Sequence, residues 1–279
     1  MLELHCHTTC SDGTLTPSEL VQAAVGAGVR ALAITDHDTL AGWDEALATA
    51  QAYDLEIVPG LELSTVHRGR SLHILGFYPN RDLLQDPLAE RLAGRKRRAQ
   101  EIARKLAELG YPIQLPTMGP GMAPGRPHIA SALVQAGHVQ SSREAFDRWL
   151  GEDKPAYVHY EKFGSDQGIA LLRSCGAVPV WAHPYLFRGG DVEAVLPELV
   201  AVGLMGVEVY HPHHSPSESH KLERLCAQYG LLMTGGSDYH GPSQNRKDTD
   251  RSQLNMLKVP LTLLEPVRQA AAQLHSQLR

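Results

Sequence analysis

The chain has 279 residues, of which 43% are hydrophobic, so it can bury the core of one large barrel or of two smaller domains. Its formal net charge of −5 argues against a general electrostatic grip on long nucleic acid, but it leaves small anions and strand ends open as partners. No apolar run approaches the roughly 20 residues that cross a bilayer, and MLELHCHTTCSDG lacks the layout of a signal peptide, so we expect a cytoplasmic protein with no membrane partner.

Short runs rich in Val, Ile and Leu alternate with helix-like stretches, a rhythm typical of an α/β fold with a parallel sheet. Seven strands are predicted, over residues 2–5, 31–35, 56–62, 72–77, 178–183, 206–210 and 231–235. The first helix should follow Thr16 and run to about Gly28, because Thr16-Pro17-Ser18-Glu19 has the order of a capping box with proline at N1. Further helices are predicted over 40–53 and 264–278.

The strand and helix rhythm is interrupted between residues 81 and 162. A charged stretch with Arg95-Lys96-Arg97-Arg98 comes first, then a Pro/Gly-rich segment over 116–127, then helix-like sequence to Leu150. This separation is far longer than an ordinary connection, so we predict a barrel domain over 1–80 and 163–279 and a mostly helical insertion domain over 81–162. The basic run favours a solvated helix face over a site for a polynucleotide backbone.

The first strand ends in His5-Cys6-His7, where the two-residue period of a strand directs both imidazoles to one face. Asp12 follows in a loop in which Gly13 permits a tight turn, so its carboxylate can return to the same place. An HxH motif alone is more often chance than half a metal site. The four cysteines, Cys6, Cys10, Cys175 and Cys226, have no disulfide-like spacing and are expected to be free thiols.

Further donors follow the next strands. In TDHDT, residues 35–39, helix capping would explain Asp38 but would leave His37 between two acids unexplained, so function and capping are equally favoured. Glu62 ends the third predicted strand. His73 lies among aliphatic residues of the fourth, a setting more typical of a core residue than of a ligand.

The last donors end later strands, where His183 precedes a proline and where Asp238 and His240 share a face if the chain is extended. Each motif has a structural explanation, but the joint chance is small, because parallel strands bring their carboxyl ends to one rim of a barrel. The nine candidate ligands are His5, His7, Asp12, His37, Glu62, His73, His183, Asp238 and His240. Nine donors exceed the needs of one zinc, so two or three divalent ions are implied, and imidazole with carboxylate suits Mn²⁺, Zn²⁺ or Fe²⁺.

These motifs, in this order, resemble those of the PHP (polymerase and histidinol phosphatase) family over nearly the whole chain. The resemblance implies an α/β fold, a distorted (β/α)7 barrel with a trinuclear metal site, and metal-dependent hydrolysis of phosphate esters. It also implies three ligand sets: His5, His7, Glu62 and Asp238, with Glu62 bridging; Asp12, His37 and His240; and Glu62, His73 and His183.

Within the family, the length, the insertion and Gly125-Arg126-Pro127-His128 look most like phosphoesterases that hydrolyse nucleoside 3′,5′-bisphosphates and trim short 5′-phosphorylated RNA. The resemblance implies that Arg126 and His128 bind substrate over the barrel mouth, since a guanidinium can fork two hydrogen bonds onto phosphate. From the residue alone, a solvated loop arginine would be preferred. The expected partner is therefore a small nucleotide or an RNA end, and no protein partner is evident.

The chemistry so implied is in-line attack on phosphorus by a metal-bound hydroxide, with no protein nucleophile. Asp36 is a candidate partner that orients a ligand imidazole, and His128 is a candidate acid for the leaving group. Two alternatives stay open, a histidinol-phosphate phosphatase and a non-catalytic metal-binding module. The insertion argues mildly against the first, and the complete set of donors argues against the second.

Overall fold

The computed structural model describes residues 1–119, 122–159, 163–242 and 252–278. Its seven strands are β1 (Leu2–Glu3), β2 (Ala31–Ile34), β3 (Glu56–His67), β4 (Arg70–Phe77), β5 (Val178–Trp181), β6 (Gly206–Tyr210) and β7 (Leu232–Gly235). They form one sheet in the order of the chain. The amide of Leu4 donates to the carbonyl of Gly235 at 3.1 Å, and that of His7 to Tyr239 at 2.9 Å. These bonds join the two ends of the sheet, so it is nearly closed into the predicted distorted barrel.

The sheet is mixed rather than wholly parallel. β4 runs antiparallel to both β3 and β5, whereas the other neighbouring pairs are parallel. β3 and β4 are joined by a two-residue turn in which Arg68 and Gly69 have φ angles of 49° and 77°. Two positive φ angles are typical of the type I′ turns that close hairpins. The prediction of a parallel sheet is therefore wrong at β4, and Glu62, predicted at a strand end, lies inside a longer β3.

In the part of the chain that the structure describes, six α-helices pack around the barrel: α1 (Pro17–Gly26), α2 (Trp43–Ala50), α6 (Ser165–Ser174), α7 (Val192–Ala201), α8 (Pro216–Tyr229) and α9 (Leu264–Gln277). α1 begins with the predicted capping box, because Thr16 accepts a hydrogen bond from the amide of Glu19 and the Glu19 carboxylate accepts one from Thr16. α1 and α2 end two to three residues before the predicted limits. α9 confirms the predicted last helix.

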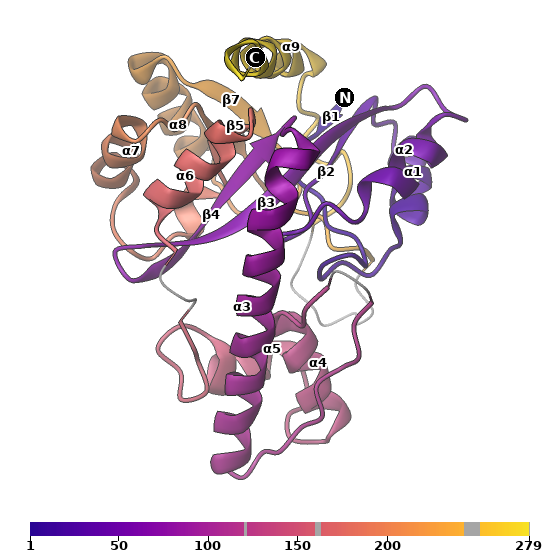
Figure 1. Cartoon of the computed structure of the whole chain (residues 1–279), viewed down its shortest axis with the longest axis vertical. Coiled ribbons are helices and arrows are strands. Elements are labelled where there is room, and N and C mark those ends of the chain that lie inside the picture. Colours follow the sequence, from indigo (N-terminus) through magenta and orange to yellow (C-terminus); the bar gives the residue numbers. More distant parts are fainter. Residues whose placement is uncertain (120–121, 160–162, 243–251, 279) are drawn as a thin grey trace.

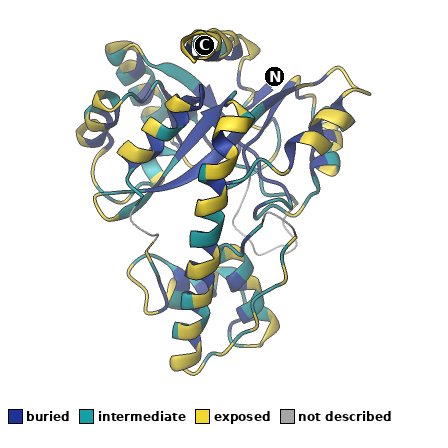
Figure 2. Ribbon diagram, in the orientation of Figure 1, coloured by how far each residue is buried: buried dark blue, intermediate teal, exposed yellow. Residues whose placement is uncertain are grey.

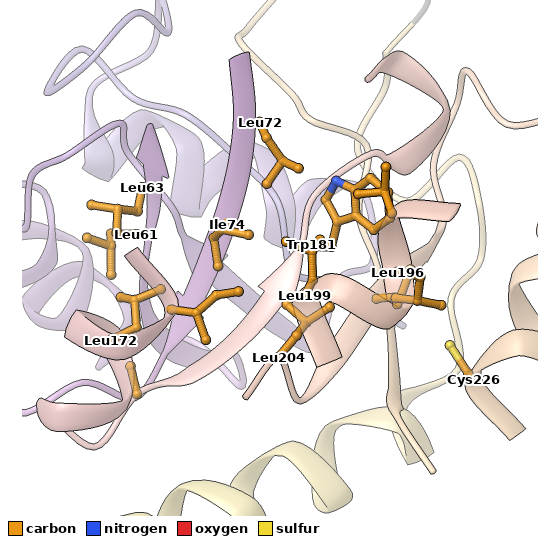
Figure 3. Close-up of a cluster of buried hydrophobic side chains, with 14 of the residues drawn as sticks. Leu61, Leu63, Leu72, Ile74, Leu172, Trp181, Leu196, Leu199, Leu204 and Cys226 are labelled. Atoms are coloured by element: carbon orange, nitrogen blue, oxygen red, sulfur yellow. The ribbon is translucent and has the colours of Figure 1, made fainter. Parts of the chain in front are cut away.

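Alternate residues of the strands pack into different cores, as the two-residue period requires. Ala31 and Ala33 of β2 face a core closed by α9, whereas Leu32 and Ile34 face α1 and α2. A third core lies between β3 to β6 and the helices α6 to α8, with Trp181 among its largest side chains (Figure 3). Figure 2 shows the strands buried and the outward helix faces exposed.

The insertion contains α3 (Arg81–Glu108), α4 (Arg126–Gln135), α5 (Ser142–Ala145) and the π-helical turn η1 (Phe146–Leu150). α3 runs from the barrel to the far end of the molecule, where α4 and α5 lie beside it (Figure 1). Leu84 and Leu88 pack in a barrel core, whereas Ile102 and Leu106 pack in a separate core with α4. One helix thus ties the two cores together. The domain limits remain a prediction, and residues 160–162 lie outside the described residues.

Only half of the basic run is a solvated helix face. Lys96 and Arg97 are exposed, whereas Arg95 and Arg98 are buried. Nε of Arg98 donates to the carbonyl of Val158 at 2.7 Å, and Arg95 pairs with Asp38 of the barrel. The sequence around Arg95 and Arg98 suggested that they face solvent, because their partners, Asp38 and Val158, are distant in the chain.

Two expectations from composition can be compared with the structure. All four cysteines are free thiols, as predicted. Within the described ranges, no helix combines the length and the hydrophobicity that a membrane span requires.

Candidate metal centre

The predicted ligands gather around Glu62, which β3 carries into the barrel mouth. The two carboxylate oxygens of Glu62 lie within 3.3 Å of a ring nitrogen from each of five residues: His5, His7, His37, His73 and His183. The shortest of these distances, 2.7 Å, joins Oε1 of Glu62 to Nδ1 of His73. One carboxylate that faces five imidazoles is suited to bridge metal ions.

Asp238 completes a first group of donors. Its Oδ1 lies 3.2 Å from Nε2 of His5 and 3.1 Å from Nε2 of His7. Together with Glu62 these residues offer four ligand atoms that all lie within 4.8 Å of one another. The four are the first ligand set that the family resemblance implied.

Asp12 is the centre of a second group. Its Oδ1 lies 3.3 Å from Nε2 of His240 and 3.5 Å from Nδ1 of His7, and its Oδ2 lies 3.7 Å from Nε2 of His37. A β-carbon on Gly13 would lie 2.4 Å from the carbonyl oxygen of His7, so the turn that returns Asp12 to the site requires glycine. This group contains the second implied set, and His7 borders it as well as the first.

The third group is formed by His37, Glu62 and His73. His183 adjoins it, because its Nε2 lies 3.1 Å from Oε1 of Glu62. β4 begins at the rim where the parallel strands end, since it runs the opposite way, and this direction brings His73 to the site. The structure therefore gathers all nine predicted ligands, with His7, His37 and Glu62 each shared between two groups.

The donor atoms fit metal ions better than they fit one another. Five of them are buried and have no hydrogen-bond partner among the described residues: Nε2 of His5 and His7, Oδ1 of Asp12 and Asp238, and Nδ1 of His37. Buried polar atoms without partners are costly, and in native proteins they usually indicate a bound ion or water. Their number and convergence fit a site for divalent metal ions.

Hydrogen bonds behind the site fix the orientation of several imidazoles. Nδ1 of His5 donates to Glu208 at 2.9 Å, and Nδ1 of His240 donates to the carbonyl of Asp238 at 2.8 Å. Nε2 of His73 lies 3.2 Å from the hydroxyl of Ser71. Partners of this kind set the tautomer, so that the other ring nitrogen keeps its lone pair for a metal.

Sequence reasoning missed Glu208. It is fully buried in β6, and its Oε2 accepts a hydrogen bond from the amide of His183 at 2.8 Å. A lone acid in the apolar strand Gly-Val-Glu-Val-Tyr was the available signal. Because the carboxylate holds both His5 and the backbone at His183, it positions two candidate ligands.

Three residues of the site have left-handed backbone conformations. The φ angles are 52° at Asp38, 33° at His183 and 53° at Asp238. Such conformations are uncommon for residues other than glycine, and where they occur they cluster at functional sites. Here they follow β2, β5 and β7, where the backbone must turn sharply after each strand to direct a side chain inward.

The electrostatics of the cluster keep Glu62 ionised. Burial alone would raise the pKa of this carboxyl group, but the charges of the surrounding imidazoles, those of His37 and His73 first, hold the pKa well below its usual value. The pKa of Asp238 is likewise held low, against burial, chiefly by His5 and His240. Ionised carboxylates are the form that binds a metal.

The predicted substrate residues occupy different places. Arg126 lines a cavity of about 250 Å³ together with Glu62 and other donors. His128 is half-buried beside it, and its Nδ1 accepts a hydrogen bond from the amide of Gly125 at 3.2 Å. Among the described residues in the wall of that cavity, Arg126 is present and His128 is not.

Asp36 orients an imidazole only indirectly. Its carboxylate accepts hydrogen bonds from the amide and the hydroxyl of Thr8 and from the hydroxyl of Ser11. The Ser11 hydroxyl in turn lies 3.4 Å from Nδ1 of His7. Asp36 therefore reaches the imidazole of His7 only through Ser11, and its hydrogen bonds chiefly stiffen the loop after His7.

A family model described as PHP domain matches residues 3–114. A 5′-3′ exoribonuclease of Haemophilus influenzae is 36% identical over 247 residues, which cover 86% of this chain and 90% of that protein. A 3′,5′-nucleoside bisphosphate phosphatase of Chromobacterium violaceum is 30% identical over 261 residues, which cover 90% and 91%. A solved structure from Bifidobacterium adolescentis, assigned as a metal-dependent phosphoesterase, has a TM-score of 0.86 at 31% identity and covers 96% of each chain. The likeness therefore extends over the barrel and the insertion together.

Proposed function

This chain belongs to the PHP domain family and is a metal-dependent phosphoesterase, and from that premise we propose that it hydrolyses nucleoside 3′,5′-bisphosphates, with short 5′-phosphorylated RNA as a second substrate. The observation that carries the proposal is the cavity in which the donors around Glu62 face Arg126. It joins groups that can hold divalent ions to a guanidinium suited to phosphate. Relatives that act on RNA and on nucleoside bisphosphates support this choice of substrates.

The three donor groups are proposed to hold two or three divalent ions, of Mn²⁺, Zn²⁺ or Fe²⁺. When bound, such ions activate water and neutralise phosphoryl oxygens, which removes the need for a protein nucleophile. The histidines of this chain then act as ligands rather than as general bases, because the second ring nitrogen of His5, His73 and His240 is already engaged. Glu62 is proposed to bridge two of the ions.

Arg126 is proposed to bind a phosphate of the substrate. Its guanidinium lies 5.8 Å from the ring centre of Phe146 and 5.4 Å from that of Tyr157, and Nη1 donates to the carbonyl of Leu150 at 3.4 Å. It also lines an adjoining cleft of about 320 Å³. A guanidinium held in place loses little freedom on binding, and its place at the junction suits a substrate with two phosphates.

His128 is proposed to bind substrate rather than to protonate the leaving group. Burial lowers the pKa of this imidazole, so the neutral form prevails at neutral pH. Because Nδ1 accepts a hydrogen bond from Gly125, Nε2 carries the proton and can donate to a phosphate oxygen. A neutral imidazole is a good hydrogen-bond donor but a weak acid.

The test is phosphate release by metal-stripped protein resupplied with Mn²⁺. The panel contains adenosine 3′,5′-bisphosphate, adenosine 5′-monophosphate, histidinol phosphate and a short 5′-phosphorylated RNA. We expect release from the bisphosphate and the RNA. A preference for histidinol phosphate, or silence on every substrate with metal bound, would overturn the proposal.

Two variants connect the activity to the site. Asp238→Ala should lose both metal and turnover while it keeps the circular dichroism of the folded protein. Arg126→Ala should keep its metal and show a raised KM for the bisphosphate. Full activity of Asp238→Ala would place the reaction elsewhere.

A further inference from the structure

Two arginines of α3 converge on one buried carboxylate. Nη1 of Arg95 lies 2.8 Å from Oδ2 of Asp38, and Nε of Arg91 lies 3.4 Å from Oδ1 of the same residue. The Asp38 side chain is fully buried, and that of Arg95 is only 7% exposed. The two arginines are one helical turn apart and share a face of α3. They form a matched pair whose surroundings can be compared.

Only one of the two reaches the cavity. Arg95 forms part of the cavity wall together with Glu62, whereas among the described residues of that wall Arg91 is absent. Arg91 instead stacks on the ring of Phe163, 4.0 Å from its centre, and donates to the backbone carbonyl of Ser64. Its contacts are those of a residue that fastens α3 to the barrel.

The guanidinium of Arg95 contacts the barrel through Nη1 and faces the insertion through Nη2. Nη1 contacts Asp38 and lies 3.4 Å from the hydroxyl of Ser64. Nη2 lies 3.4 Å from the point where a β-carbon on Gly125 would sit, next to Arg126. A guanidinium stays charged at any ordinary pH and offers five donors in a rigid fork, which matches a phosphate.

Building on the proposed function, we propose that Arg95 binds the phosphate group that is hydrolysed, and that Asp38 is the residue that positions it. A phosphate in the cavity meets the donors around Glu62 on one side and the guanidinium of Arg95 on another. Fixed charges of this kind stabilise the negative charge of the reacting group without reorganisation. Arg126, which also lines the outer cleft, is then left for the second phosphate.

The position of Asp38 links this arginine to the metal centre. Asp38 directly follows the candidate ligand His37, and its Oδ1 also accepts a hydrogen bond from the amide of Ser64 at 2.9 Å. One short loop after β2 therefore sets both a ligand and the anchor of Arg95. Loss of the anchor should weaken phosphate binding without removal of a ligand.

The experiment compares Arg95→Ala with Arg91→Ala in the metal-loaded, full-length enzyme. Inorganic phosphate, as a competitive inhibitor, is the probe of the reacting-phosphate position. Because a hydrogen bond to a charged group contributes roughly 1.5–3 kcal/mol, we expect Arg95→Ala to raise the phosphate Ki and to lower kcat/KM by about 10- to 100-fold. Arg91→Ala should leave both constants near wild type, and the metal content of both variants should be unchanged.

Two further variants guard against an effect on folding alone. Arg95→Lys keeps a charge beside Asp38, so it should fold, but it lacks the fork and should still raise the phosphate Ki. Free guanidinium ions can occupy the vacated position beside Asp38, so they should partly restore both the activity and the phosphate Ki of Arg95→Ala. Asp38→Asn should raise KM and the phosphate Ki while it keeps bound metal.

A wild-type phosphate Ki in both Arg95 variants of an active enzyme would overturn this inference. Equal losses in Arg91→Ala and Arg95→Ala, with no rescue by guanidinium, would also overturn it, because the arginines would then serve only to anchor α3. Wild-type protein that is inactive on every substrate would instead reject the proposed function. Calorimetric titration with inorganic phosphate would still decide the role of Arg95 in that case.

Discussion

Glu208 holds two candidate ligands, His5 and His183, in position, although it does not belong to the three donor groups. Replacement by glutamine keeps the shape but removes the charge that faces Nδ1 of His5 and the amide of His183. Loss of such a partner typically costs about 10- to 100-fold in metal affinity, so Glu208→Gln should release its metal to a weaker chelator than wild type does. Metal analysis after graded chelator dialysis measures this.

A matched control for that variant is Glu223→Gln on α8. Glu223 accepts a hydrogen bond from the hydroxyl of Tyr210 and lies outside the donor groups. It should retain metal as wild type does. Identical retention by the Glu208 and Glu223 variants would mean that Glu208 is not needed to orient the ligands.

His214 should make the protein less stable in mild acid. Burial lowers the pKa of this imidazole from 6.5 to about 4, and Nδ1 donates to the carbonyl of Val209 at 2.9 Å. Because the folded pKa lies below the unfolded value, the contribution of neutral His214 is present above pH 6.5 and is lost as the pH falls towards 4. His214→Gln should therefore show a smaller fall in Tm between pH 7 and pH 5 than wild type.

The exposed His220 of α8 provides the comparison for that pH series. His220→Gln removes an imidazole from the surface rather than from a buried position, so this variant should keep the pH dependence of wild type. If His214→Gln and wild type lost the same Tm over this range, the ligand histidines alone would account for the acid sensitivity.

At the scale of single residues, motif and strand position were enough to predict that the nine candidate donors converge, because each follows or lies in a recognisable strand. The same reasoning could not find the role of Arg95, since a run of four basic residues usually faces solvent and its partner Asp38 is 57 residues away. Glu208 was missed for a related reason. The strand pattern shows that its side chain alternates with two valines, but not that His5 lies opposite.

The contact between the segments after β1 and β7 depends on one glycine. A β-carbon on Gly236 would lie 2.4 Å from the backbone nitrogen of His5 and 2.6 Å from its β-carbon. Gly236→Ala must therefore displace His5 or separate the strands, and overpacking of this kind costs about 1–3 kcal/mol. Urea unfolding should show that loss, together with reduced metal content.

Gly26, the last residue of α1, is the matched site. A β-carbon there would meet nothing within 4 Å. Gly26→Ala should leave metal binding unchanged and should stabilise the protein slightly, by up to about 1 kcal/mol, because alanine is the better helix former. A Gly236→Ala protein with wild-type stability and metal content would show that the contact between the segments after β1 and β7 can rearrange without loss of stability.

The strands and most helices were predictable because their apolar runs are long and clearly bounded. The direction of β4 was predicted wrongly, although Arg68-Gly69 between two apolar runs was a usable hairpin signal. An apolar run predicts a strand but not its direction, because its composition is the same in either direction. Only the short turn, too brief for the crossover that a parallel pair needs, distinguishes the two arrangements.

The donor groups also join parts of the chain that are far apart, from His5 to His240. Metal ions that bind the native site but not the unfolded chain add stability as RT ln(1 + [L]/Kd), about 4 kcal/mol at a thousandfold excess over Kd. Removal of metal with a chelator should therefore lower Tm, and Mn²⁺ should restore it. The Asp238→Ala variant should respond less, because it has lost a ligand of the first group.

The loss of stability should be uneven across the molecule, because the metal groups lie beside the middle of α3, at Arg95, whereas the core of the insertion lies towards its C-terminal end. Amides that join the segments after β1 and β7, such as those of Leu4 and His7, should exchange hydrogen faster after chelation. Amides around Ile102 and Leu106, in the core shared with α4, should keep their protection. Hydrogen exchange read by mass spectrometry separates the two regions. Equal loss in both would mean that α3 transmits the change and that the barrel and the insertion unfold as one cooperative unit.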